Sequence, residues 1–129
     1  MRERTSVWLK IAFDDLDAAE HCCQGEKLLW AMFMCQQAVE KALKAVYFEK
    51  TGQTPPRKHD LISLAGDAGV LAALDQETKK FLRRLSYYYI ETRYPDKRIE
   101  LESKCTVHHV RETLHKAKEV LLWLKKELS

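Results

Sequence analysis

Glycine and proline are scarce in this 129-residue chain, which contains 4 glycines and 3 prolines. An all-β fold with many tight turns needs more of both, so their scarcity argues against that fold class. No apolar run approaches the ~18 residues of a membrane span. The first residues also lead into no unbroken apolar stretch of the kind found in a signal peptide. We therefore expect a cytoplasmic protein that makes no contact with a membrane.

The motifs of several catalytic and metal-binding classes are absent as well. The sequence has no Gly-rich phosphate loop, no HExxH motif and no Cys/His set with zinc spacing. His108 and His115 lie seven residues apart, whereas metal-binding pairs on a helix usually use a spacing of four. The 4 cysteines form no CxxC pair, and the neighbours Cys22 and Cys23 are poorly placed for a mutual disulfide. We expect reduced, mostly buried thiols and neither a metal nor a cofactor.

Hydrophobic residues make up 46% of the chain and charged residues 32%, a composition typical of a folded protein with a solvated helical surface. The length fits one ordinary domain, so we treat residues 1–129 as a single unit. The formal net charge of +3 permits contact with phosphate. It falls short of the strong basic excess that is typical of a dedicated nucleic-acid binder.

Apolar residues recur at helical spacing along the whole chain, and no useful length of sequence alternates with period two. Gly25 is expected to end the first helix in a left-handed cap, and Asp75 to cap a later one. Pro95 cannot continue a helix normally, so a bend is expected there. The prediction is an all-α, up-and-down bundle of four long helices and one short one. The helices are expected at about 6–24, 26–50, a short segment from 59, 75 to about 92, and 103–128.

The last predicted helix carries an apolar seam whose spacing alternates between three and four residues. Such a seam packs either inside the same bundle or against a second chain, and the sequence leaves both open. The seam consists of Val107, Val110, Leu114, Ala117, Leu121, Leu124 and Leu128.

Polar side chains share one arc of the second helix from residue 36 onward, at Gln36, Gln37, Glu40, Lys41 and Lys44. One interpretation is a solvated face, on which Glu40 and Lys44 form an i,i+4 ion pair contributing a few tenths of a kcal/mol. The other is a polar strip beside a cleft.

Three consecutive tyrosines at 87–89 precede Arg93-Tyr94-Pro95-Asp96, where the fourth long helix ends. The planar guanidinium of Arg93 suits phosphate or carboxylate, and Tyr94 can stack on a base. Alternatively, Arg93 pairs with a carboxylate of the bundle such as Glu40, and Tyr94 packs under the loop.

These segments together resemble the HEPN domain family (higher eukaryotes and prokaryotes nucleotide-binding). The resemblance is carried by the run 36–45, by Pro56 and His59-Asp60-Leu61, and by Arg93-Tyr94-Pro95-Asp96, in this order. It implies a helical bundle, frequent homodimers and a small nucleotidyltransferase as partner, in a toxin–antitoxin or two-component pair. Carried over onto this chain, the family pattern marks Glu40, Lys41, Lys44, His59, Arg93 and Tyr94.

The first functional hypothesis is a non-catalytic module that binds a nucleotide or a nucleotide-like ligand. Lys41, Lys44 and Arg93 would hold phosphate, Tyr94 or Tyr89 would stack on the base, and His59 would contact the ligand or position Arg93.

Two alternatives belong to other classes of protein. The first is a ribonuclease toxin that uses His59 as acid/base and Arg93 to stabilise charge on RNA. The chain lacks the Arg, four to six residues, then His pattern that HEPN ribonucleases share, which weighs against this alternative. The second is a purely structural dimerisation domain.

Overall fold

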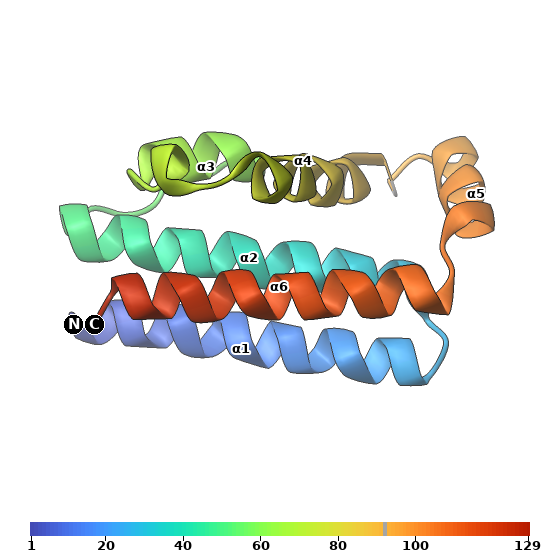
Figure 1. The fold of residues 1–129 in the computed structure, drawn as a ribbon, viewed down its shortest axis with the longest axis horizontal. Helices are drawn as coiled ribbons and strands as arrows, with labels where there is room; N and C mark the ends of the chain where they lie inside the picture. The colour runs from blue at the N-terminus through green and yellow to red at the C-terminus, as the bar shows by residue number, and fades with distance from the viewer. Residues whose placement is uncertain (92) are drawn as a thin grey trace.

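The structure is a computed structural model that describes residues 1–91 and 93–129 (Figure 1). In these ranges it is helical and contains no strand, which confirms the predicted all-α bundle. A 3₁₀ turn, η1 (Leu71–Ala73), lies between the third and fourth helices. The helices are α1 (Glu3–Gln24), α2 (Leu28–Thr51), α3 (Leu61–Asp67), α4 (Gln76–Glu91), α5 (Pro95–Lys104) and α6 (Val107–Glu127).

Helix α2 is the centre of the bundle and contacts every other α-helix. Helices α1, α2 and α6 lie side by side, while α3 and α4 run along the other side of α2 (Figure 1). The sequence of α2 explains this position, because its first half is apolar on nearly every side. Its fully buried side chains include Met32, Val39, Leu43 and Val46.

The apolar seam of α6 packs inside this chain. Val110, Ala117, Leu121 and Leu124 are all at most 1% exposed and belong to the single hydrophobic core. Of the two interpretations of the seam, the structure therefore shows the intramolecular one.

Polar side chains fix the start of several helices. The Asp60 carboxylate accepts a hydrogen bond from the Ser63 amide at 2.9 Å, and Asp75 accepts one from the Thr78 amide at 2.8 Å. Each satisfies an amide that the helix itself leaves without an acceptor. The predicted cap at Asp75 is therefore present in the structure.

The left-handed residue at the end of α1 is not the glycine that the sequence predicted. Gly25 has φ −83°, and the left-handed residue is Glu26 at φ 59°. The amides of Glu26 and Lys27 donate to the carbonyls of Cys23 and Cys22, which is the Schellman arrangement. The position that favours glycine therefore falls one residue after Gly25, on a glutamate.

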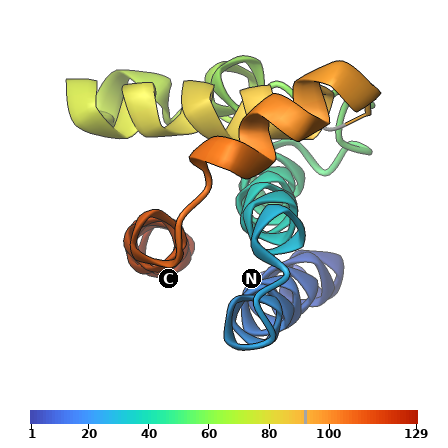
Figure 2. The ribbon, with the colours of Figure 1, turned by 90° about the vertical axis from the view of Figure 1, so that its right-hand side faces the viewer.

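Helix α5 was not among the helices predicted from the sequence. Tyr94 has extended backbone and Pro95 is the first helical residue, so the expected bend is present and a new helix begins in it. Only Leu101 of its ten residues is buried, which gives α5 almost no apolar signal. It crosses the end of the bundle in front of α4 (Figure 2).

The helices were also compared with the length and apolar character of a membrane span. None of those in the described residues could cross a membrane.

Candidate functional site

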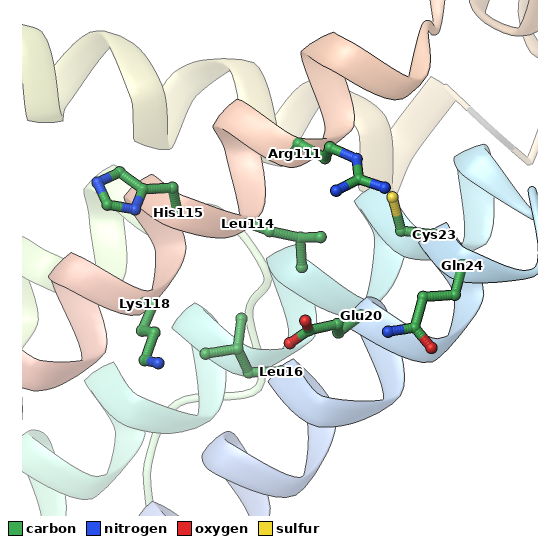
Figure 3. A pocket seen from close by; sticks show the side chains of 8 residues that line it. All are labelled: Leu16, Glu20, Cys23, Gln24, Arg111, Leu114, His115 and Lys118. Carbon is green, nitrogen blue, oxygen red and sulfur yellow. The ribbon is translucent and has the colours of Figure 1, made fainter.

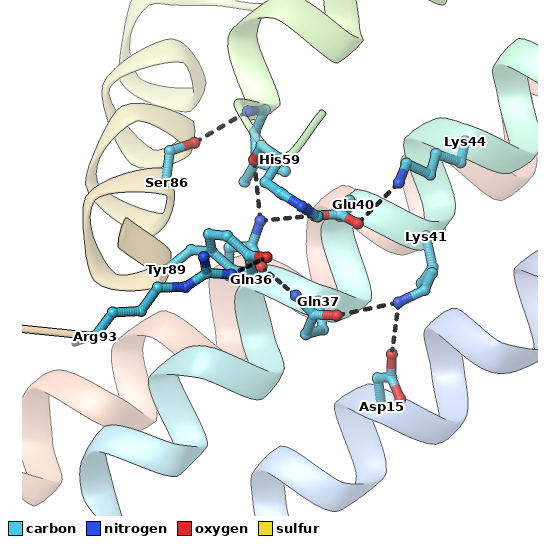
Figure 4. Close-up of polar contacts among 11 residues, drawn as sticks. Asp15, Gln36, Gln37, Glu40, Lys41, Lys44, His59, Ser86, Tyr89 and Arg93 are labelled. Atoms are coloured by element: carbon cyan, nitrogen blue, oxygen red, sulfur yellow. Dashed lines mark hydrogen bonds and ion pairs between the residues drawn. The ribbon is translucent and has the colours of Figure 1, made fainter. Parts of the chain in front are cut away.

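A buried carboxylate lies at the centre of the candidate site. Glu40 of α2 is 2% exposed and accepts from Lys44 Nζ at 3.0 Å and from Gln36 Nε2 at 3.1 Å. His59 Nδ1 lies 2.9 Å from the same carboxylate (Figure 4). Burial alone would raise the pKa of Glu40, but the hydrogen bonds from His59, Lys44 and Gln36 lower it below its ordinary value. Glu40 is therefore an anion that fixes three side chains around it.

The loop before α3 delivers His59 to this carboxylate. The Leu61 amide donates to Ser86 Oγ on α4 at 3.0 Å, and Gln36 Nε2 also donates to the His59 carbonyl at 3.1 Å. A carboxylate only accepts, so the ring nitrogen that faces Glu40 carries the proton. The imidazole is thereby held in one orientation, with 46% of its side chain exposed.

Tyr89 of α4 connects His59 to Arg93. The His59 ring stacks on Tyr89 at 4.3 Å between centroids, and the Phe33 ring stacks on it at 5.5 Å. The Arg93 guanidinium carbon lies 4.5 Å from the Tyr89 centroid, and Arg93 donates a hydrogen bond to the Tyr89 hydroxyl (Figure 4). Among the described residues, Arg93 forms no ion pair with a carboxylate. An arginine held by an aromatic ring keeps its charge available for an anion.

A second branch of the network leads to α1. Gln37 donates to Gln36 at 2.7 Å, and Lys41 donates to Gln37 at 3.1 Å while lying 3.9 Å from Asp15. Burial raises the pKa of Asp15, and Lys41 acts in the opposite direction. The Lys41 ammonium therefore already has two partners inside the bundle.

Six of the seven predicted site residues belong to this one network, and Tyr94 does not. Arg93 bonds to Tyr89 and not to Glu40, so the alternative pairing with that carboxylate is absent. Tyr94 is 59% exposed and does not pack under the loop. The six connected residues are Glu40, Lys41, Lys44, His59, Tyr89 and Arg93.

A cavity of about 220 Å³ lies beside Arg93. Of the predicted residues only Arg93 lines it, and sequence reasoning missed the rest of the wall. The exposure of Trp30 could have been suspected, because a helix that is apolar on all sides must place some large side chain outside the core. The wall consists of Leu29, Trp30, Phe33, Arg93 and Arg98.

A separate hollow of about 330 Å³ lies between α1 and α6 (Figure 3). Glu20 projects from α1 on one side, and Arg111 projects from α6 on the other (Figure 3). His115, which also lines it, pairs with Glu119 of its own helix at 3.0 Å. None of the predicted site residues lines this hollow. In the part of the chain that the structure describes, no group of His, Cys, Asp and Glu is arranged to hold a metal ion.

Comparison with known proteins places this geometry in context. A family model described as HEPN domain matches residues 5–128. The structure is similar to that of TT1696 from Thermus thermophilus, with 27% identity, a TM-score of 0.82, and coverage of 97% of this chain and 98% of the other. ST0689, described as an archaeal HEPN homologue, shares the fold at 23% identity and a TM-score of 0.76, over 100% of both chains. No curated protein matched the chain.

Proposed function

The chain belongs to the HEPN domain family, and from that premise we propose that it is a binding module for a nucleotide, held by its phosphate at Arg93. The proposal rests on the contacts and the position of the Arg93 guanidinium. It is positioned by the ring and hydroxyl of Tyr89, it lines a cavity, and it has no carboxylate partner among the described residues.

The surroundings of Arg93 suit phosphate recognition. A planar guanidinium presents paired N–H donors to phosphate oxygens, and a held arginine loses less side-chain freedom on binding. The hydroxyl of Tyr89 accepts from Arg93, and His59 stacks on the same ring, oriented by Glu40. His59 and Glu40 are therefore positioning residues in this proposal.

For Lys41 and Lys44 we propose a different role from the phosphate contact that the sequence led us to expect. Lys44 is 8% exposed and bound to Glu40, while Lys41 is shared between Gln37 and Asp15. An ammonium whose charge is already balanced by a carboxylate attracts phosphate less strongly than a guanidinium with no carboxylate partner does. We therefore place the phosphate at Arg93 alone and assign the two lysines to the support of the network.

Calorimetric titration of AMP and ATP into the purified protein tests the proposal. We expect binding that Arg93→Ala abolishes and that Arg83→Ala preserves. Arg83 is the matched control, because it is an exposed arginine of α4 that does not line the cavity. Equal binding by Arg93→Ala and the wild type, or no binding by the wild type, would refute the proposal.

RNA cleavage is a second candidate function, which one observation favours. His59 and Arg93 are 34 positions apart in the sequence, yet both contact Tyr89, and a buried carboxylate orients the histidine. An oriented imidazole and a guanidinium that contact the same tyrosine supply the groups needed for acid–base chemistry at a phosphodiester. Cleavage of labelled RNA that His59→Ala abolishes would support this candidate. RNA left intact at high protein concentration would reject it.

We further propose, from family membership, that the module forms a homodimer and works with a small nucleotidyltransferase. Sedimentation of the protein over a hundredfold range of concentration tests the dimer, and a concentration-independent monomer would reject it. Co-purification with a nucleotidyltransferase encoded beside this chain tests the partner.

A further inference from the structure

Trp30 is an exposed wall of the cavity that Arg93 lines. Its side chain is 51% exposed on α2, although tryptophan carries a large apolar surface. The Phe33 ring meets it edge-on, with centroids 5.9 Å apart at an angle of 83°. The two rings are therefore perpendicular, so Phe33 does not form a parallel stack with the indole, and half of the Trp30 side chain stays open to solvent.

Arg98 of α5 takes up the position over the Trp30 ring. Its guanidinium carbon lies 5.8 Å from the Trp30 centroid, which is near the outer limit of a cation–π contact. The other partner of Arg98 is Glu102, one turn along the same helix, at 3.2 Å. Within the described part of the chain, the ion pairs of α5 join its own residues, and Leu101 is its single buried side chain. Arg98 can therefore leave Trp30 without breaking an ion pair to the rest of the bundle.

We propose that the indole of Trp30 is the platform on which the base of the ligand stacks, taking the place of the Arg98 guanidinium. This inference rests on the proposed function, because it adds a base to a ligand whose phosphate is at Arg93. Stacking on an aromatic side chain tolerates any base, since every base has a π-face. The ligand class is thus a nucleotide recognised by base and phosphate together, not any small phosphate.

The two tyrosines expected to stack on the base are placed less well. Tyr89 is 8% exposed, and His59, Phe33 and Arg93 already cover its ring. Tyr94 is exposed but is not part of the cavity wall. Trp30 is an aromatic side chain that is both exposed and in the same cavity as Arg93.

The test compares a ligand that has a base with one that lacks it. AMP and ribose 5-phosphate are titrated by calorimetry into the wild type, Trp30→Ala, Arg93→Ala and Tyr87→Ala. Tyr87 is the matched control, an aromatic side chain of α4 that is 44% exposed and lies outside the cavity wall. We expect Trp30→Ala to weaken AMP binding by roughly tenfold and to leave ribose 5-phosphate binding unchanged. Arg93→Ala should abolish the binding of both ligands.

Other outcomes separate the failure of this inference from that of the proposed function. If AMP and ribose 5-phosphate bind equally, and Trp30→Ala changes neither, the base makes no contact with Trp30 while the phosphate site at Arg93 stands. If Tyr87→Ala weakens AMP binding as much as Trp30→Ala does, the role of Trp30 is not specific and the inference fails. If neither ligand binds the wild type, the proposed function fails and this inference fails with it.

Fluorescence gives an independent reading on the same residue. A variant with Trp8→Phe and Trp123→Phe keeps Trp30 as its one tryptophan, since the chain has three. AMP should change the emission of this variant with the affinity found by calorimetry, whereas ribose 5-phosphate should not. An emission that AMP leaves unchanged at saturation would overturn the placement of the base.

Discussion

At the residue scale, the site depends on one buried anion. Glu40 is 2% exposed, and its carboxylate holds Lys44, Gln36 and His59 within hydrogen-bond distance. A buried charge is tolerated only when it is paired and hydrogen-bonded, and removing one partner leaves the other charge uncompensated. The carboxylate therefore contributes both to stability and to the orientation of the imidazole that packs on Tyr89.

Glu40→Gln is expected to lower the free energy of unfolding by about 3 kcal/mol at pH 7, because the Lys44 ammonium loses its buried counter-ion. Lys44→Met in the same background should recover part of the loss. Urea unfolding of the two single variants and the double variant measures the coupling. Equal stability of Glu40→Gln and the wild type would show that the pair contributes nothing.

The stability difference between the wild type and Glu40→Gln should also depend on pH. The folded-state pKa of Glu40 is lower than its ordinary value of 4.5, so the ionised carboxylate favours the folded state. The difference is therefore largest above pH 4.5 and shrinks as the pH falls through the lower, folded-state pKa. Thermal unfolding of both proteins between pH 2.5 and 7 checks this, and a difference that grows on acidification would contradict it.

Substitutions at the end of α1 should change stability in the opposite direction to the one that the sequence alone suggests. Glu26 has φ 59°, a conformation that costs a non-glycine residue energy, whereas Gly25 has φ −83°. Glu26→Gly should raise the free energy of unfolding by roughly 0.5–1 kcal/mol, and Gly25→Ala should leave it unchanged or higher. Urea denaturation measures both, and destabilisation by Glu26→Gly would show that the glutamate is not strained.

At the element scale, α5 is the part of the fold with the weakest attachment. It contributes one buried side chain, Leu101, while Ile99 is 68% exposed. An element with few buried contacts opens at a lower free energy than the whole molecule does. Since Arg98 lies on this helix, its attachment also decides how readily Trp30 is uncovered.

Leu101→Ala should release α5 while the rest of the bundle stays folded. Hydrogen exchange of the α5 amides is expected to accelerate by at least tenfold, with α2 and α6 unchanged. Ile99→Ala is the matched control, because it shortens an exposed side chain of the same helix. Unchanged exchange of α5 in Leu101→Ala, or faster exchange throughout the bundle, would refute a local role for this contact.

At the scale of the whole molecule, α2 organises one core and α6 closes it. Adjacent leucines of α6 test this arrangement, because Leu121 is 0% exposed and Leu122 is 49% exposed. Leu121→Lys should abolish cooperative thermal unfolding, while Leu122→Lys should leave the melting temperature within a few degrees of the wild type. A Leu121→Lys protein that remains folded and only dissociates would place the seam between chains.

The four long helices could be predicted from the sequence, because 3.6-residue periodicity survives in each of them and Asp75 marks a start. Helix α5 could not, since one buried leucine in ten residues leaves no pattern to detect. The sequence also pointed to Glu40, His59 and Arg93. Their link through Tyr89 depends on how α4 packs against α2. The same packing buries Tyr89, so that its ring is not available to stack on a base. Such placement is tertiary information, which local spacing does not contain.

Titration of the ¹⁵N-labelled protein with AMP, followed through side-chain NMR signals, is the decisive measurement for a phosphate contact at Arg93 and a base contact at Trp30. We expect the Arg93 Nε–H and Trp30 indole N–H signals to shift together with one affinity. The Arg83 and Trp123 signals should stay in place. Shifts at Arg111, in the hollow between α1 and α6, with Arg93 and Trp30 unmoved, would contradict it.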